Sequence, residues 1–178
     1  MIKLAKAFLI SLCLILFYAD WLSAELKVVY CNEGGQCPNQ SQDCDSNHNN
    51  DIVLDSQTGL IWSRDAKLWE PLDFNNAQQK IKDLRLCGYS NWRLPHIREL
   101  EKLGGYCTGP KKCAAWLNAN GFIGVQPYQY WSRNLDAAQA KTSLHVVMVY
   151  NFKNDLSQFI LPTYLINAWP VSARPDKK

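Results

Sequence analysis

Hydrophobic residues recur along the chain with a helical period in some segments and with a strand period in others. One set of apolar residues, spaced three or four positions apart, is Phe74, Ala77, Ile81 and Leu84. This spacing places the four side chains on one face of an α-helix. Asp73 precedes them and can cap the helix by accepting hydrogen bonds from its free N–H groups. The pattern predicts an amphipathic helix with one face on the core.

The same periods, with glycine and proline positions, predict the remaining elements. Further helices are expected at 95–103 and 114–120. Strands are expected at 51–54, 59–63, 144–152, from 156 to about 161, and 166–173. Helices that precede a run of strands favour an α+β domain over a βαβ array. Residues 25–50 are expected to be irregular, residues 51–174 to form one domain, and residues 175–178 to form a short tail.

The segment between the first two helices combines a turn with a short extended run. Gly88 can adopt positive φ and turn the chain. Trp92 and Leu94 lie on the same side of an extended run, because side chains alternate along a strand. Pro95 keeps Leu94 out of helical dihedrals and fits the first turn of a helix. The segment is therefore expected to lead directly into the second helix.

The tryptophans are expected to be buried in the core, and one arginine is expected to bond within the fold. Aromatic side chains bury large apolar areas. Six of the seven tryptophans follow residue 24, and each is expected in the core: Trp62, Trp69, Trp92, Trp116, Trp131 and Trp169. Arg93 lies between Trp92 and Leu94 on the opposite strand face. We expect it to pair with an acid such as Glu99, or with backbone carbonyls.

The first 24 residues have the three-part layout of a secretory signal peptide. Lys3 and Lys6 precede an apolar run at 7–19, and Ala24 supplies a small residue for cleavage. The run is shorter than the ~20 apolar residues that span a bilayer. Membrane contact is therefore expected only transiently, through the signal. We expect the mature chain in the periplasm, on the outer surface or secreted, in a Gram-negative bacterium.

Cysteine usage agrees with export. Removal of the signal takes Cys13 with it and leaves six cysteines, and an even number in an exported chain indicates disulfides. The alternative, a metal site, needs close pairs such as C-x-x-C, which the sequence lacks. Cys107 and Cys113 flank a turn-rich loop and are expected to pair. The other four allow three pairings, of which we favour Cys31–Cys37 with Cys44–Cys87.

No residue pattern indicates catalysis, a cofactor or a bound metal. The histidines have no ligand spacing such as H-E-x-x-H; they are His48, His96 and His145. Ser63 and Ser132 follow tryptophans but lack a nucleophile-elbow context. The acidic-amide segment 43–51 fails the EF-hand pattern, because neither its turn glycine nor its last glutamate is present. We expect a protein that is not an enzyme.

Two sets of basic residues are candidate ligand contacts. They are Lys80, Lys82 and Arg85 on or near the first helix, and Lys111 and Lys112 between Cys107 and Cys113. The mature chain carries a formal charge near +2, which does not indicate nucleic-acid binding. Clusters of Lys and Arg bind polyanions such as sulfated glycans by charge. The alternative is that these are solubilising charges, because acidic residues are interspersed with them.

Five motifs occur in an order that resembles a known family. They are D-x-x-T-G-L-x-W-x-R at 55–64, G-x-S-N-W-R-L-P-x-x-x-E-L at 88–100, Y-W-S at 130–132, V-Y-N-F at 149–152 and W-P-V-S-A-R at 169–174. Together they resemble the C-terminal domain of the Legionella collagen-like adhesin over about residues 49–174. Asn91 stands where that family usually has Asp, and Trp169 where Arg is common. The structural signature comprises Trp62, Trp92, Arg93, Leu94, Pro95, Glu99 and Trp131.

The resemblance implies a C-type-lectin-like fold, with two main helices packed on a twisted antiparallel sheet and with long loops. It also implies binding of sulfated glycosaminoglycans and self-association into a homo-oligomer. Recognition of a glycan or protein in adhesion is therefore the leading function. The alternative is a structural subunit of an envelope or secretion assembly that contacts protein only. A third reading is an oxidoreductase like formylglycine-generating enzymes, which are similar in fold, but their late reactive cysteine pair has no counterpart after Cys113.

Overall fold

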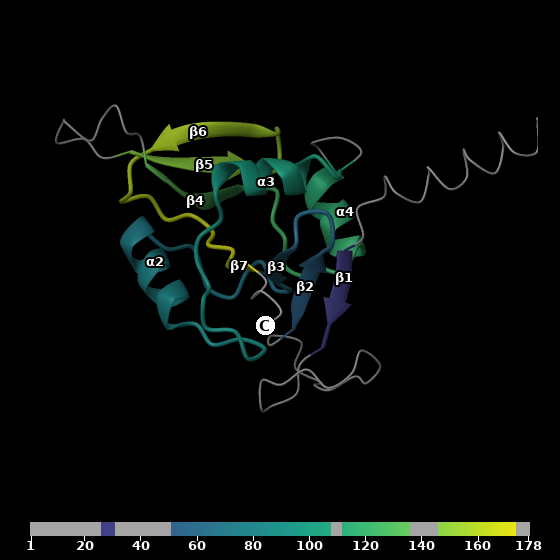
Figure 1. Cartoon of the computed structure of the whole chain (residues 1–178). Helices are drawn as coiled ribbons and strands as arrows, with labels where there is room; N and C mark the ends of the chain where they lie inside the picture. The colour runs from purple at the N-terminus through teal and green to yellow at the C-terminus, as the bar shows by residue number, and fades with distance from the viewer. Residues whose placement is uncertain (1–25, 31–50, 108–111, 136–145, 174–178) are drawn as a thin grey trace, which may run out of the picture.

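The computed structural model describes residues 26–30, 51–107, 112–135 and 146–173. These residues form helices and two antiparallel sheets, which confirms the α+β class (Figure 1). The helices are α2 (Phe74–Asp83), α3 (Ile97–Gly104) and α4 (Cys113–Ala119). The strands are β1 (Leu26–Val29), β2 (Ile52–Asp55), β3 (Leu60–Ser63), β4 (Gln129–Leu135), β5 (Val147–Asn151), β6 (Leu156–Ile160) and β7 (Val171–Ala173). The predicted signal peptide, residues 31–50 and the tail at 175–178 lie outside the described residues.

The first sheet has the strand order β1-β2-β3-β7, and every neighbouring pair is antiparallel. The prediction that residues 25–50 are irregular is wrong for Leu26–Val29, which form β1. Val28 pairs with Val53 of β2, and Leu26 and Val28 pack on the buried core. Their alternation in the short run L-K-V-V is a strand signal, and the edge of β2 supplies the hydrogen-bonding partner.

The second sheet has the order β4-β5-β6. The hairpin β5–β6 lies where the sequence predicts it, and Asp155 closes its turn with φ of +58°. Strand β4 was not expected from the pattern. Its residues Tyr130 and Trp131 are adjacent in sequence and both fully buried. Because both faces of β4 are covered, the strand lacks the apolar–polar alternation by which a half-exposed strand is found.

The predicted final strand at 166–173 is shorter than expected, since only Val171–Ala173 form β7. The preceding residues connect the two sheets. Ile166 bridges to Leu72, and Asn167 bridges to Tyr130 of β4, before β7 pairs with β3. Pro170 has no N–H to donate to a strand ladder. The segment therefore passes from the second sheet to the first instead of pairing along one neighbour.

Helices α2 and α3 begin at residues whose side chains cap them. The N–H of Asn76 donates to the side chain of Asp73 at 3.0 Å, which confirms the predicted cap of α2. After α2, Gly88 takes φ of +75° and turns the chain as predicted. His96 caps α3 from the position after Pro95. In each case a residue that satisfies free helix N–H groups sets the start of the helix.

Two adjoining clusters of buried side chains form the core. Trp169 is fully buried in the first cluster, which α3 and α4 cover. Its ring contacts those of Trp62, Phe122, Tyr130 and Phe152 at centroid distances of 4.9–6.0 Å. In the second cluster, Phe74 of α2 meets Trp131 edge-on at 5.4 Å. Helices α2 and α4 therefore lie on opposite sides of the molecule (Figure 1).

Candidate functional site

The turn between β2 and β3 is organised by the side chain of Asp55. Its carboxylate accepts hydrogen bonds from the N–H groups of Gln57 and Thr58 and from the Thr58 hydroxyl. The Tyr106 hydroxyl donates to the same carboxylate at 3.0 Å. Burial and the charge of Asp55 raise the pKa of Tyr106, so the phenol stays protonated. The D-x-x-T-G motif thus holds a turn against the segment after α3.

Arg64, at the end of the same motif, also points inward. Its Nη1 lies 2.6 Å from the carboxylate of Asp51, whose side chain is fully buried. Its Nε donates to the carbonyl of Gly121 at 3.1 Å, and its guanidinium lies 5.2 Å from the centroid of the Tyr30 ring. Removing one partner of such a pair would leave a buried charge uncompensated. Arg64 therefore connects the first sheet to the loop after α4.

The W-R-L-P run packs against β7 with its apolar side chains inward. Trp92 is buried, and its Nε1 donates to the carbonyl of Tyr89 at 3.1 Å. Leu94 is buried in the same cluster, so the predicted shared face of Trp92 and Leu94 is confirmed. Arg93 exchanges two backbone hydrogen bonds of 3.0 Å with Val171. The run is therefore part of the structural frame.

Arg93 and Glu99 form a bidentate ion pair at the start of α3, which confirms the expected pairing. Nη1 and Nη2 of Arg93 each lie 2.7 Å from a carboxylate oxygen of Glu99, and the N–H of His96 donates to the same carboxylate. Burial would raise the pKa of Glu99, but the hydrogen bonds from Arg93 and His96, with the charges of Arg93 and Arg133, hold it below its usual value. The side chain of Arg93 is therefore bonded within the fold.

The Y-W-S motif lies in β4, and its polar atoms are also bonded internally. The Nε1 of Trp131 donates to the carbonyl of Leu72 at 2.8 Å. The Ser132 hydroxyl donates to the carbonyl of Met148 at 2.7 Å. Two residues later, Asn134 accepts the N–H of Ile97 at 2.7 Å and so holds the first turn of α3. The motif positions β4 between the helices and β5.

The structure bears on part of the predicted disulfide framework. Cys107 and Cys113 are joined, with their Cα atoms 5.0 Å apart, which confirms that pairing. The bond ties the end of α3 to the start of α4. Cys87 is also disulfide-bonded. Cys31, Cys37 and Cys44 lie outside the described residues, so the favoured pairings Cys31–Cys37 and Cys44–Cys87 stay predictions.

The described members of the two predicted basic sets lie on opposite sides of the molecule. Lys80 and Lys82 are exposed near the end of α2, where Arg85 donates to two terminal carbonyls at 2.9 and 3.2 Å. Lys112 immediately precedes α4, across the molecule from α2 (Figure 1). Lys111 lies outside the described residues. Among the described residues the structure therefore does not bring the two sets together, and Arg85 partly caps the end of α2.

Side chains that could support metal or acid–base chemistry are dispersed. Within the described ranges, no group of three or more His, Cys, Asp or Glu side chains is placed to hold a metal ion. The Ser63 hydroxyl donates to the carbonyl of Asp65 at 2.9 Å. The ring of His96 contacts the N–H of Arg98 and the amide of Asn134. His48 and His145, with most of the 43–51 segment, lie outside the described residues.

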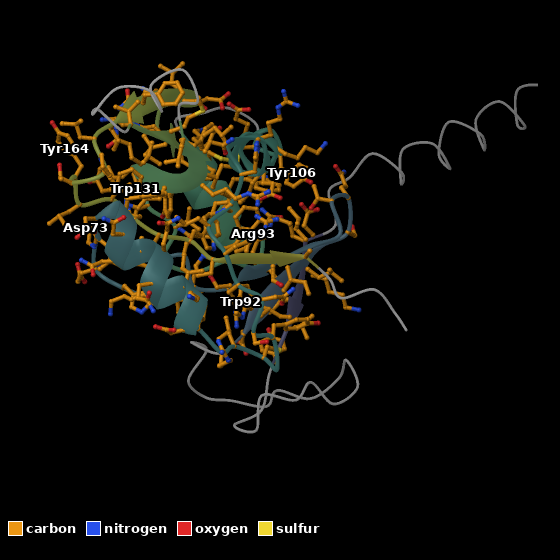
Figure 2. The ribbon with its side chains drawn as sticks, turned by 60° about the vertical axis from the view of Figure 1, so that its left-hand side comes forward. Asp73, Trp92, Arg93, Tyr106, Trp131 and Tyr164 are labelled. Carbon is orange, nitrogen blue, oxygen red and sulfur yellow. A yellow bond between two sulfur atoms is a disulfide. The ribbon has the colours of Figure 1, made fainter. Side chains whose placement is uncertain are left out.

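A polar pocket lies between the start of α2 and the segment after β6. Its volume is about 380 Å³, and it is lined by Asp73, Asn75, Asn76, Pro162 and Thr163. Tyr164, which follows the lining directly, is 58% exposed. Figure 2 shows Tyr164 and Asp73 on the same flank. Sequence reasoning missed this pocket, because its two walls are far apart in the chain and neither carries a recognisable motif.

Comparison with known proteins identifies the family. A family model described as the Lcl C-terminal domain matches residues 51–172. This match includes the four motifs between residues 55 and 152 and most of the fifth at 169–174, and it confirms the resemblance inferred from them. No curated protein sequence matches the chain. In the part of the chain that the structure describes, none of the helices has the length and apolar character needed to cross a bilayer. The chain belongs to the Lcl C-terminal domain family.

Proposed function

We propose that this chain is a non-enzymatic binding module that acts outside the inner membrane in surface recognition or adhesion. The family match over residues 51–172 carries the proposal, since the family is that of an adhesin domain. The predicted signal peptide supports a periplasmic, surface or secreted location.

The proposal includes a C-type-lectin-like fold. It is supported by two longer helices, α2 and α3, that pack on antiparallel strands. It is also supported by long segments without regular structure, such as residues 84–96 and 161–170. An experimental structure superposed on C-type-lectin-like domains would test this part, and a different strand connectivity would contradict it.

The ligand that the charges favour is a sulfated glycan. The near-neutral chain supplies little general attraction for a polyanion, so binding has to come from local basic groups. Lys80 and Lys82 are exposed, and the ammonium of Lys80 lies 6.0 Å from the centroid of the Trp69 ring. Lys111 and Lys112 would form a separate contact on the other side. The geometry thus favours two small basic contacts rather than one continuous groove.

A heparin column with a salt gradient tests this ligand. Wild-type protein should be retained at low salt and released as salt rises, because screening weakens charge-driven binding. Lys80→Glu with Lys82→Glu, or Lys111→Glu with Lys112→Glu, should reduce retention without changing the melting temperature. Lys153→Glu, at an exposed hairpin turn, is the matched control. No retention at low salt, or retention that survives both reversals, would contradict the sulfated-glycan proposal.

The assembly alternative is favoured by the exposed apolar side chains around β6. No charged residue occurs from 156 to 173, and Leu156 and Phe159 are 57% and 45% exposed. Among the described strands, β6 pairs only with β5. An uncharged edge strand with apolar side chains is usually protected or covered. The test is sedimentation over a concentration series: self-association that Phe159→Lys abolishes would support a second copy on this edge.

A further inference from the structure

We infer that the pocket between α2 and residues 161–165 binds a neutral, hydroxyl-rich saccharide, with Tyr164 at its rim as a stacking surface. The inference rests on the proposed function only in taking the ligand of this domain to be a glycan. It differs from that proposal in both place and chemistry. The basic residues Lys80 and Lys82 lie toward the other end of α2, roughly 10 Å further along a helix that rises 1.5 Å per residue.

The polar groups that line the pocket match those of a sugar. Asn75 and Thr163 are exposed, and in the part of the chain that the structure describes their side chains have no hydrogen-bonding partner. An amide offers two donors and an acceptor, and a hydroxyl both donates and accepts. Sugar hydroxyls likewise donate and accept, so both side chains can serve them. Pro162 adds an apolar wall suited to the C–H groups of a pyranose ring.

The charge at the pocket disfavours an anion. The carboxylate of Asp73 accepts the backbone N–H of Asn76 at 3.0 Å and its side-chain amide at 2.6 Å. These bonds lower the pKa of Asp73, so the group is ionised at neutral pH. A helix N-terminus can bind phosphate or sulfate when its N–H groups are free. Here the carboxylate of Asp73 occupies the position that such an anion would take, and its negative charge would repel a sulfated ligand.

The two walls of the pocket are held together by the fold. The N–H of Phe74 donates to the carbonyl of Pro162 at 2.9 Å. One step outward, Leu72 and Ile166 exchange two hydrogen bonds of 2.9 Å. Beneath them the ring of Phe74 packs on Trp131. A site whose walls are fixed before binding loses less entropy when the ligand arrives.

Tyr164 supplies the remaining feature of a saccharide site. Its position on the same flank as Asp73 can be followed in Figure 2. The turn that carries it is closed by its own N–H, which donates to the carbonyl of Leu161. A tyrosine ring is a rigid, amphipathic surface that costs little conformational entropy to order. It can cover the apolar face of a sugar while its hydroxyl stays in water.

Affinity chromatography of the full mature chain on immobilised neutral polysaccharides (a glucan, a mannan and a galactan) tests the inference. Wild type should be retarded on at least one of them, equally at low and high salt, because no charge is involved. Tyr164→Ala and Asn75→Ala should each weaken that affinity about tenfold or more, as loss of a central contact does. Tyr128→Ala is the matched control, since Tyr128 is 59% exposed and Tyr164 58%.

The outcomes separate this inference from the heparin-binding proposal. The reversals at Lys80 and Lys82 should leave neutral-polysaccharide binding intact, and Tyr164→Ala should leave heparin retention intact. The inference is overturned if wild type passes all three columns unretarded, or if both pocket variants bind like wild type. It is also overturned if retention disappears at high salt, which would assign the binding to the basic residues. Unchanged melting temperatures of the variants exclude misfolding as the cause of a loss.

Discussion

Two regions of the molecule differ in how fully their polar side chains are engaged within the fold. In the signature region, defined as residues 55–64 and 88–100, the charged side chains of Asp55, Arg64, Arg93 and Glu99 all bond within the fold. In the α2 flank, defined as residues 73–76 and 161–165, the polar side chains of Asn75 and Thr163 have no partner among the described residues. The difference indicates that the family motifs specify the structural frame, while the ligand contacts that we propose lie where no motif occurs.

The largest expected effect comes from truncating the signature tryptophan. Trp92→Ala should lower the free energy of unfolding by about 3–5 kcal/mol, because the buried ring leaves a cavity and its hydrogen bond to Tyr89 is lost. Urea unfolding followed by tryptophan fluorescence would measure it. If the variant keeps wild-type stability but loses a ligand, Trp92 is a binding platform and the contrast between the two regions fails.

Opening the disulfide next to the signature region should have the next largest effect. The double variant Cys107→Ser with Cys113→Ser should lose about 2–3 kcal/mol, the usual figure for releasing a short loop in the unfolded state. The same unfolding experiment measures it, and reducing agent should bring wild type toward the variant. A variant as stable as wild type would show that the link between α3 and α4 does not support the frame.

A single methyl group at the end of α3 tests how tightly this frame is packed. A Cβ on Gly104 would lie 1.9 Å from the hydroxyl of Tyr150, which is buried and bonded to Asp155. Gly104→Ala should therefore cost about 2 kcal/mol, as overpacking does. Gly105→Ala is the matched control, because the nearest atom to its Cβ is 3.3 Å away. Equal stabilities of the two variants would contradict this packing.

The Arg93–Glu99 pair should make the signature region sensitive to pH. The folded state holds the pKa of Glu99 below its unfolded value, so the stabilisation is present above the unfolded pKa and is lost as pH falls through the folded one. Arg93→Ala should cost about 1–2 kcal/mol at pH 7, a value reduced by partial solvent exposure. That difference should shrink in acid. A difference that is constant with pH would assign the loss to packing alone.

The smallest effect on stability is expected in the α2 flank. Tyr164→Ala should change the free energy of unfolding by no more than about 0.5 kcal/mol, because the ring is exposed. Thermal unfolding measured beside wild type and Tyr128→Ala would establish it. A loss of more than about 1 kcal/mol would mean that Tyr164 supports the frame, and the two regions would then not be distinct.

The sequence predicts local structure well where one residue governs it. Asp73 and the helical spacing after it identify α2, because capping and periodicity depend only on neighbours in the chain. Strand β4 is not predicted from the sequence, because the segments that bury both of its faces are distant in the chain. The sequence also does not show that residues 166–170 connect the two sheets, since Ile166 and Asn167 pair with different partners that lie far away in the chain.

The candidate sites show the same limit. Proximity in sequence groups Lys80, Lys82 and Arg85, yet the structure shows that Arg85 is partly engaged by helix carbonyls. It also places α4, which Lys112 directly precedes, on the far side of the molecule from α2. The polar pocket joins residues ninety positions apart, Asp73 and Thr163. Charge can be counted from a sequence, but the surface it forms depends on how the elements pack.

The family, the α+β class and the Cys107–Cys113 bridge could be inferred from the sequence alone, and Glu99 was one of the partners expected for Arg93. Each of these rests on a motif or on groups within a few residues of one another, where backbone geometry limits the alternatives. The tertiary structure was needed to show that the motif side chains face inward, that Lys112 lies far from Lys80 and Lys82, and that Thr163 and Asn75 line one pocket. These features depend on the packing of two sheets and three described helices, and that packing is set by long-range burial that no local pattern contains.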